Sequence, residues 1–284
     1  MKMTWLAVCT LLAIVLAPFL LAGCGKSSTE AREYQSLADF GGRRIGVVTG
    51  AIQGQAIEKE IPTAQLCYYN SVPDLLAAAR LGKVDAFSAS NQIIRYLMLD
   101  NEDLTYLDTP LTEPMDIGAI FPRTDKGQKL RSEFNEYLAK ARDEGTLNEL
   151  DAIWLGKDES KKTVPDLSSL SGENGSLVLA TDSSMVPNSY IKDNLNVGMD
   201  IDNCIRFCKE YGYALEIVDM SFNGIVDAVA AGKCDFAAGA IAYTKERAQS
   251  VDFSDPVFQA YSVVAYLKDE GEQTVKTAKT LEDL

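Results

Sequence analysis

Short apolar runs alternate with amphipathic stretches along most of the chain after residue 36. The apolar runs predict strands at residues 45–49, 65–69, 85–89, 177–180, 214–219, 235–238 and 262–267. The amphipathic stretches predict helices at residues 53–59, 73–81, 92–99, 202–210 and 222–231, with two longer helical stretches within 126–154. Strands that alternate with helices in this way predict βαβ units and largely parallel sheets.

One polar stretch interrupts this alternation. Residues 157–174 contain Pro165 and repeated serines, which indicates a linker. The segments 71–90 and 221–240, one on each side of it, share Ser, Ala, Gly-Lys and Asp at the same offsets. Any α/β protein repeats a helix, turn and strand, but the identity at both turns favours two related lobes.

The N-terminus has the layout of a secretory signal. Lys2 is the only charged residue among the first 24, and an apolar run interrupted by Pro18 follows it. The sequence LAGC at 21–24 resembles the bacterial lipobox. This resemblance implies cleavage before Cys24, a diacylglycerol on its thiol and a polar tether behind it. The alternatives are a plain membrane-spanning anchor, for which the run is short, or a buried thiol.

Composition narrows the classes of function. The 284 residues include 41 acidic and 27 basic side chains, for a formal net charge of −14, which argues against nucleic acid as the main partner. There is no histidine, so the commonest general base, the Ser-His-Asp triad and the usual zinc ligand are missing. Carboxylate, Lys or Tyr chemistry stays open, so an enzyme is disfavoured rather than excluded.

The cysteines beyond the signal do not form a metal-binding pattern. They are Cys67, Cys204, Cys208 and Cys234, without a CxxC pair. We expect no metal and no cofactor. Buried free thiols are favoured over a disulfide, although an exported protein can oxidise one pair.

Several motifs point to one family. The segment VDFSDPVF at 251–258, preceded by TKER at 244–247, resembles the bacterial extracellular solute-binding proteins of family 3, as do LVLATDSS at 177–184 and VGMDIDNC at 197–204. These are extracytoplasmic receptors for amino acids in ABC uptake systems. The resemblance implies an α/β fold of the periplasmic-binding-protein-like type II, in which two lobes each have a central, mostly parallel sheet flanked by helices, with a ligand cleft between them. It also implies a small-molecule ligand, an ABC permease as partner and a monomeric state.

The order of the segments departs from this family. IGVVTGAIQGQAIEKE at 45–60 resembles the family's second lobe and GTLNELDAIWLG at 145–156 its C-terminal helix, yet both precede the first-lobe motifs. A circular permutation explains this order, and so does a slice of a tandem array. Because the pieces sum to one complete receptor, the permutation is favoured. The expected parts are a signal peptide (1–23), the lipidated Cys24 with its tether (24–36), a lobe 2-like unit (37–112), a return segment packing on lobe 1 (113–156), the linker (157–174) and a lobe 1-like unit ending at the hinge (175–284).

The position of the ligand cleft follows from the sheets. Ligands of open α/β sheets bind beyond the carboxyl ends of the strands. The expected strand ends are Thr49-Gly50, Ser90-Asn91, Thr181-Asp182 and Ala240.

The anion-binding side of the cleft depends first on Arg247. This residue matches the family arginine that grips the ligand's α-carboxylate, and a guanidinium does so with two parallel hydrogen bonds. The alternative is a surface arginine paired with Glu246 or Asp252. Ala240 and Ala242 match family positions that offer backbone groups to the ligand.

A turn between a strand and a helix offers a second group of anion donors. Gly50 and Ala51 stand at this turn, where free N–H groups and the helix dipole favour an anion. The alternative is an ordinary tight turn.

The remaining candidates concern the rest of the ligand. Phe222 matches a family aromatic that covers the ligand's side chain, or else belongs to the core. Met185 stands where the family has a stacking aromatic. Asp182 either pairs with a cationic group of the ligand or caps the next turn.

Ser90 is the most informative departure from the family. It replaces the aspartate that neutralises the ligand's ammonium. A buried ammonium without a counter-charge is costly, so we expect a small carboxylate or an atypical amino acid.

Together these features predict a lipid-anchored, extracytoplasmic solute-binding protein of an ABC uptake system. One alternative is a degenerate or sensory receptor module without a transport partner. Another is a dehydratase-like enzyme on the same fold, for which Asp182 is the only obvious acid.

Overall fold

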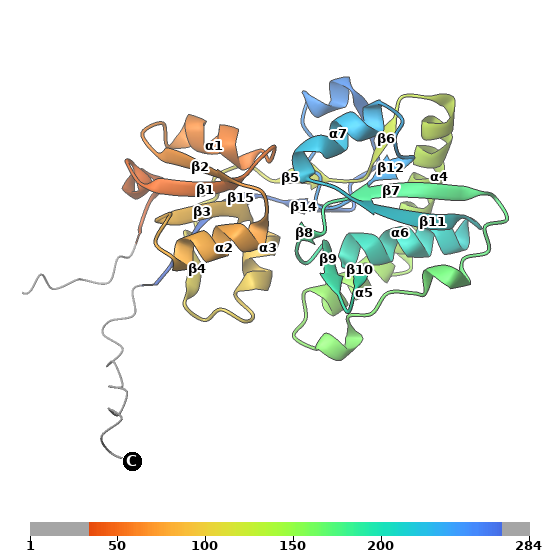
Figure 1. Cartoon of the computed structure of the whole chain (residues 1–284), viewed down its shortest axis with the longest axis horizontal. Coiled ribbons are helices and arrows are strands. Elements are labelled where there is room, and N and C mark those ends of the chain that lie inside the picture. The colour runs from red at the N-terminus through yellow and green to blue at the C-terminus, as the bar shows by residue number, and fades with distance from the viewer. Residues whose placement is uncertain (1–33, 269–284) are drawn as a thin grey trace, which may run out of the picture. The chain divides into compact units, whose positions relative to one another are not determined.

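The computed structural model describes residues 34–268, which form two α/β lobes. The N-terminal lobe comprises residues 34–112 and 262–268, and the central lobe comprises residues 118–257. Two strands carry the chain between the lobes and pair with each other in antiparallel fashion, β5 (Met115–Ile117) and β14 (Phe258–Ala260) (Figure 1). The predicted signal peptide and lipidated Cys24 lie outside the described residues.

A five-stranded sheet in the order β2-β1-β3-β15-β4 forms the N-terminal lobe. Its strands are β1 (Arg44–Val48), β2 (Gln65–Tyr69), β3 (Ala86–Ser90), β4 (Leu104–Tyr106) and β15 (Ser262–Leu267). Its helices are η1 (Leu37–Phe40), α1 (Gln53–Glu60), α2 (Val72–Arg80) and α3 (Asn91–Leu97). Strands β1, β2 and β3 are parallel, and β15 is antiparallel to both β3 and β4.

A second five-stranded sheet, in the order β11-β7-β12-β6-β13, forms the central lobe. Its strands are β6 (Ile120–Pro122), β7 (Ser176–Thr181), β11 (Ala214–Asp219), β12 (Phe236–Ala237) and β13 (Val251–Phe253). Its helices are α4 (Asp125–Asp143), α5 (Thr146–Trp154), α6 (Met199–Glu210), α7 (Phe222–Ala230), η2 (Glu159–Lys161), η3 (Leu167–Ser169) and η4 (Arg247–Gln249). A small antiparallel sheet adds β8 (Ser184–Met185), β9 (Ser189–Lys192) and β10 (Leu195–Val197). The predicted α/β class, with sheets flanked by helices, is confirmed.

The repeated segments seen in the sequence take the same conformation in the two lobes. Each forms a helix, a turn and a strand, α2–β3 in one lobe and α7–β12 in the other. Gly82 and Gly232 occupy the turns with φ of +64° and +68°, a conformation that suits glycine. Asp85 and Asp235 follow, and each accepts a hydrogen bond from a backbone N–H of the neighbouring strand, that of Arg44 in β1 at 2.9 Å and that of Val178 in β7 at 2.8 Å. The shared offsets therefore mark one structural unit present in both lobes.

The prediction of residues 175–284 as part of one lobe is wrong for β15. This strand follows the crossing at β14 and pairs with β3 and β4 in the sheet of the N-terminal lobe, where its blue ribbon lies among orange ones (Figure 1). Five of its six residues are buried. An apolar strand that is buried on both faces suits the centre of either sheet, so the hydrophobicity of β15 does not show which strands it pairs with.

The segment 157–174, predicted as a linker, contains the short helices η2 and η3 and is not fully solvated. Lys162 and Leu170 are both buried. The segment joins α5 to β7 and packs against the central lobe.

Buried apolar residues continue from one lobe to the other. Leu75 and Phe87 of the N-terminal lobe belong to the same cluster as Ala180 and Ile225 of the central lobe. The lobes therefore meet near the carboxyl ends of their parallel strands, where the expected cleft lies. Within residues 34–268, no helix combines the length and the apolar character needed to cross a membrane.

Candidate functional site

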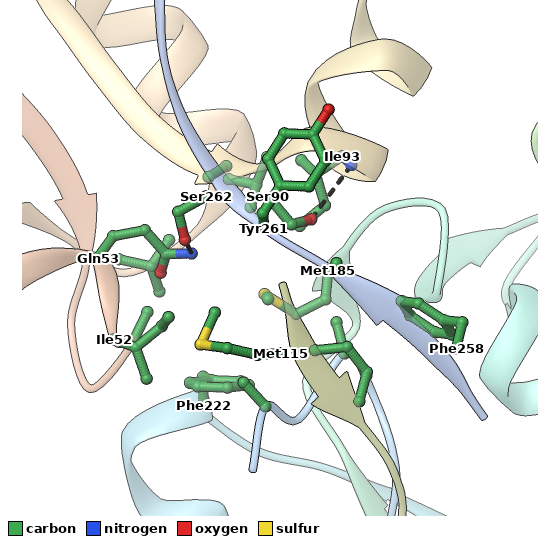
Figure 2. A pocket seen from close by; sticks show the side chains of 18 of the residues that line it. Ile52, Gln53, Ser90, Ile93, Met115, Met185, Phe222, Phe258, Tyr261 and Ser262 are labelled. Carbon is green, nitrogen blue, oxygen red and sulfur yellow. Dashed lines mark hydrogen bonds between the residues drawn. The ribbon is translucent and has the colours of Figure 1, made fainter. Parts of the chain in front are cut away.

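A cavity lies where the two lobes meet the two connecting strands. Its volume is about 40 Å³, which holds roughly three water molecules at 10–15 Å³ each. Its walls are mainly apolar, with Ile52, Ile93, Met115, Met185, Phe222 and Phe258 among the lining residues (Figure 2). Its polar side chains are those of Gln53, Ser90, Arg247, Tyr261 and Ser262.

Arg247 begins the short helix η4 and extends toward the other lobe. Its Nη1 donates to the carbonyl oxygen of Ala242 at 2.8 Å, and its Nη2 donates to that of Gly50 at 3.0 Å. The guanidinium carbon lies 5.4 Å from the centroid of the Phe222 ring. Burial lowers the pKa of Arg247, and the charge of Glu246 opposes this shift.

No carboxylate neutralises Arg247 within residues 34–268. The predicted alternative partner Asp252 pairs instead with Arg123, at 3.3 Å. The guanidinium is therefore a half-buried cation held by neutral carbonyl oxygens, and it lines the cavity. This arrangement leaves the site able to stabilise an anion.

The turn after β1 is placed at the cavity, but its backbone is engaged. Ala51 lines the cavity, and its N–H donates to the carbonyl oxygen of Val48 at 3.1 Å. Gly50 offers its carbonyl oxygen to Arg247. The expected role of the Ala51 N–H as a free anion donor is therefore wrong, because the tight turn uses it.

Ala240 and Ala242 both line the cavity. Ala240 was expected to offer backbone groups to a ligand. Its N–H is already used, because it donates to Oδ2 of Asp200 at 2.8 Å. Ala240 has a φ of +54°, an unusual conformation for a residue with a Cβ. The carbonyl oxygen of Ala242 is a partner of Arg247.

Asp200, at the start of α6, supports this part of the wall from behind. Its side chain is buried, and burial raises its pKa to about 6, while hydrogen bonds from Ala240 and Asn188 oppose the shift. Sequence reasoning missed this residue as a support of the site. The signal was an acidic residue in the first turn of a helix whose neighbours are apolar.

Phe222 and Met185 are buried and line the cavity. Phe222 opens α7 and stacks beneath the guanidinium of Arg247. Met115 of β5 lies beside Phe222 and Ile52 in Figure 2. The wall here is built of flexible thioethers and one aromatic ring, which adapt to different apolar shapes.

Asp182, which the sequence indicates as a candidate ligand contact, does not line the cavity. Its Oδ1 accepts from the N–H and the hydroxyl of Ser184, at 2.9 and 2.6 Å. Its Oδ2 accepts from the N–H of Phe222 at 2.8 Å. The alternative reading of Asp182 as a cap of the local turns is the one that these contacts support.

Ser90 lies at the cavity wall and caps α3. Its Oγ accepts from the N–H of Ile93 at 3.3 Å (Figure 2). Close by, Nε2 of Gln53 donates to Oγ of Ser262 at 3.0 Å. The polar groups on the N-terminal side of the cavity are therefore neutral.

The connecting strands and the turn into β15 contribute residues that sequence reasoning did not find. Met115, Phe258, Tyr261 and Ser262 line the cavity from β5, from β14 and from the residues after it. Strands this short show no periodicity to mark them. Only their pairing with each other brings them to the site.

The cysteines described by the structure are free thiols, as predicted. Burial raises the pKa of Cys208 to about 12 and that of Cys234 to about 11. Among residues 34–268, no group of three or more Cys, Asp or Glu side chains is placed to hold a metal ion.

The comparisons with known proteins agree with the motifs. Residues 177–282 match the family model of the bacterial extracellular solute-binding proteins, family 3. The resemblance predicted from the motifs at 177–184, 197–204 and 251–258 is confirmed, and the match covers less than half of the chain.

Curated relatives match over similar lengths. The arginine-binding extracellular protein ArtP of Bacillus subtilis (strain 168) is 33% identical over 103 residues, 36% of this chain and 40% of that protein. A probable histidine-binding protein of Campylobacter jejuni is 29% identical over 130 residues, 46% of this chain and 50% of that protein. The chain therefore matches half or less of the length of these relatives.

A solved structure adds a third similarity. An ancestral arginine-binding protein bound to arginine is 36% identical, with a TM-score of 0.29, and the match covers 30% of this chain and 38% of that chain. These relatives are named as amino-acid-binding proteins.

Proposed function

We propose that this chain is an extracytoplasmic solute-binding protein of an ABC uptake system and that it binds a small carboxylate at Arg247. One observation carries the proposal: Arg247 is the only ionised side chain at the cavity between the lobes, and no carboxylate pairs with it among residues 34–268. The family match of residues 177–282 supports the solute-binding role.

The contacts of Arg247 suggest how a carboxylate binds. Each Nη group currently donates to a backbone carbonyl, and a carboxylate is a stronger acceptor than a neutral carbonyl. The bond to Gly50 crosses between the lobes, so a hinge motion at β5 and β14 that opens the cavity also frees Nη2. The ligand carboxylate then takes the place of Gly50 on Nη2 or joins it.

We further infer that Cys24 anchors the protein to the membrane through a lipid and that the protein works as a monomer with an ABC permease. The lipobox-like sequence at 21–24 supports the anchor. The cavity has Arg247 and Tyr261 but no histidine or acid, which supports binding without catalysis. Uptake of a carboxylate that fails when the gene is deleted distinguishes transport from a sensory role, in which uptake is unaffected.

We also propose that the lobe order is a circular permutation of the family's order. The rings of Tyr34 and Tyr266, near the two ends of the described residues, lie 4.7 Å apart edge to face, so new termini at this point suit the fold. A chain rearranged to begin at residue 175 and to continue from 284 into 34–156 is expected to fold with the same affinity. Failure of that rearranged chain to fold favours the tandem-array origin.

The binding proposal is tested by calorimetric titration of the purified full-length chain with short carboxylates. Arg247→Met removes the charge and keeps much of the apolar stem, and we expect it to weaken carboxylate binding about 100-fold or more. Arg80→Met removes a similar guanidinium outside the cavity, paired with Asp103 at 2.9 Å, and is expected to leave affinity unchanged. Equal affinity of the wild type and Arg247→Met contradicts the proposal.

A further inference from the structure

The charges and polar groups that line the cavity indicate which class of carboxylate it binds. We propose that it selects short monocarboxylates with an uncharged α-carbon, bearing hydrogen, hydroxyl or oxo, over the corresponding α-amino acids. This inference rests on the proposed carboxylate binding at Arg247 and names the class of ligand for the same site.

The charge balance of the cavity favours this class. Arg247 contributes one positive charge, and the lining residues include no Asp or Glu. A monocarboxylate brings the total to zero. An α-amino acid adds an ammonium a few ångströms from its own carboxylate, so two cations would share one anion in a largely apolar space. A buried ammonium without a counter-charge binds poorly.

The buried acids nearest in the sequence to lining residues cannot supply that counter-charge. Both oxygens of Asp182 accept from Ser184 and Phe222, and its side chain lies outside the lining. Asp200 is buried behind Ala240 and accepts from its N–H. Turning either carboxylate into the cavity would leave buried N–H donors without an acceptor, which is itself unfavourable.

The polar groups that do face the cavity suit neutral partners. Ser90 accepts the capping hydrogen bond from Ile93 and still has its own hydroxyl proton to donate. Ser262 accepts from Gln53 and likewise keeps a proton to donate. Figure 2 shows Ser90 and the Gln53–Ser262 pair on the same side of the cavity as Tyr261. Hydroxyl donors match a ligand hydroxyl or oxo oxygen and offer no charge to an ammonium.

Size and wall chemistry restrict the rest of the ligand. With the lobes closed, the cavity has a volume of only about 40 Å³ and is lined by Ile52, Met115 and Met185. The ligand therefore needs some opening of the lobes, and only a short apolar tail fits beside its carboxylate. We therefore expect acids of about three carbons to bind better than longer ones, as the small volume implies.

The decisive probes are L-alanine, L-lactate, pyruvate and propionate, because they differ at the α-carbon alone. Calorimetric titration of the purified full-length chain is expected to give lactate, pyruvate or propionate an affinity at least about tenfold above that of alanine. Alanine binding as tightly as the best of the three, or more tightly, overturns the inference.

Two substitutions at Ser90 test the cause. Ser90→Asp provides the missing charge and still caps α3, because Asp is as good an N-cap as Ser. It is expected to improve alanine binding relative to lactate by at least about tenfold. Ser90→Asn also caps the helix but carries no charge, so it should not shift the preference toward alanine. Equal shifts in the two variants overturn the electrostatic explanation.

The results separate this inference from the proposed function. If alanine binds more tightly than the other three acids and its binding is lost in Arg247→Met, the proposed carboxylate binding stands and the selectivity inference fails. If no acid of the series binds the wild type, or if Arg247→Met binds as well as the wild type, the proposed function fails and the inference fails with it.

Discussion

Arg247 and Gly50 are joined by a hydrogen bond of 3.0 Å between Nη2 and the carbonyl oxygen, across 197 residues of sequence. The donor belongs to the central lobe and the acceptor to the turn after β1 in the N-terminal lobe. Gly50 has a φ of +80°, and a Cβ placed there would lie 2.7 Å from Cα of Asn223 in α7. Gly50 is therefore a point of close backbone approach between the lobes.

This approach predicts a specific effect of Gly50→Ala. The new methyl group cannot fit against the backbone of Asn223, so the lobes are held slightly apart and the Nη2 bond is lost. We expect the affinity for the best three-carbon acid to fall by about tenfold or more, because closure over the ligand is impaired. Calorimetric titration measures this change.

Gly82→Ala is the matched control for Gly50→Ala. Gly82 also has positive φ, +64°, but no atom lies within 4 Å of its added Cβ. Its substitution should lower the free energy of unfolding by about 1–2 kcal/mol through backbone strain alone, with affinity unchanged. If both variants bind like the wild type, Gly50 is not a closure contact.

Asp200 predicts a pH dependence of stability. Burial raises its pKa in the folded protein to about 6, above the ordinary aspartate value of 3.8. Between these values the folded state binds more protons than the unfolded state, so this group's contribution to stability is present in full below about pH 4 and is lost as the pH rises through 6. The loss is on the order of 3 kcal/mol.

Asp200→Asn isolates this contribution. Asn keeps an oxygen to accept from Ala240 but does not titrate in this range, so the free energy of unfolding should fall less between pH 4.5 and pH 7 than in the wild type. Other groups oppose the trend, since the hydrogen bond from Arg44 lowers the pKa of Asp85. The difference between the two proteins in urea denaturation is therefore the quantity to measure. Identical pH profiles contradict the prediction.

The linker segment holds a buried cation between the lobes. Nζ of Lys162, whose side chain is 1% exposed, lies 2.6 Å from Oε1 of Glu159. It also lies 4.6 Å from the centroid of the Tyr96 ring in the N-terminal lobe. Glu159 also pairs with the less buried Lys192, at 3.0 Å. Glu159→Gln leaves both cations without this counter-charge, and we expect a loss of about 1 kcal/mol in the free energy of unfolding, reduced from the value for fully buried pairs because Glu159 is exposed.

A double substitution tests the interpretation of this pair. Lys162→Met together with Glu159→Gln removes both charges and should recover most of the loss, since two neutral groups need no pairing. The solvent-exposed pair of Lys59 and Glu60 is the control, and Glu60→Gln should not measurably change the urea midpoint. Additive losses in the double variant contradict the prediction.

The proposed lipid anchor at Cys24 has a direct test. Cys24→Ala removes the thiol that would carry the lipid, so the protein should leave the membrane fraction and lose incorporation of a labelled fatty acid. Ligand affinity should stay the same, because the cavity proposed to bind the ligand lies within residues 34–268. Retention of Cys24→Ala in the membrane fraction contradicts the anchor.

The resemblance to family 3 gave the expectation that Arg247, Phe222 and Met185 face a ligand, and all three line the cavity. The sequence by itself determined the alternation of strands and helices, the likeness of the α2–β3 and α7–β12 units, and the sheet edge at which a site is expected. These features depend on periodicity within a segment and on the rule that sites lie at the carboxyl ends of strands. Both act over a few residues or follow from the class of sheet, so they can be deduced before any long-range contact is known.

Only the tertiary structure decided which sheet β15 joins, that Asp182 caps turns outside the cavity, and that Asp200 takes the N–H of Ala240. An apolar run reports that a strand is buried but not against which neighbour. The sequence likewise shows that a buried carboxylate needs hydrogen-bond donors but does not show which ones. The donors to Asp182 and Asp200, the N–H groups of Phe222 and Ala240, lie 40 residues away in the sequence. Residues so distant in sequence are brought together by the packing of the whole fold, which local sequence patterns do not predict.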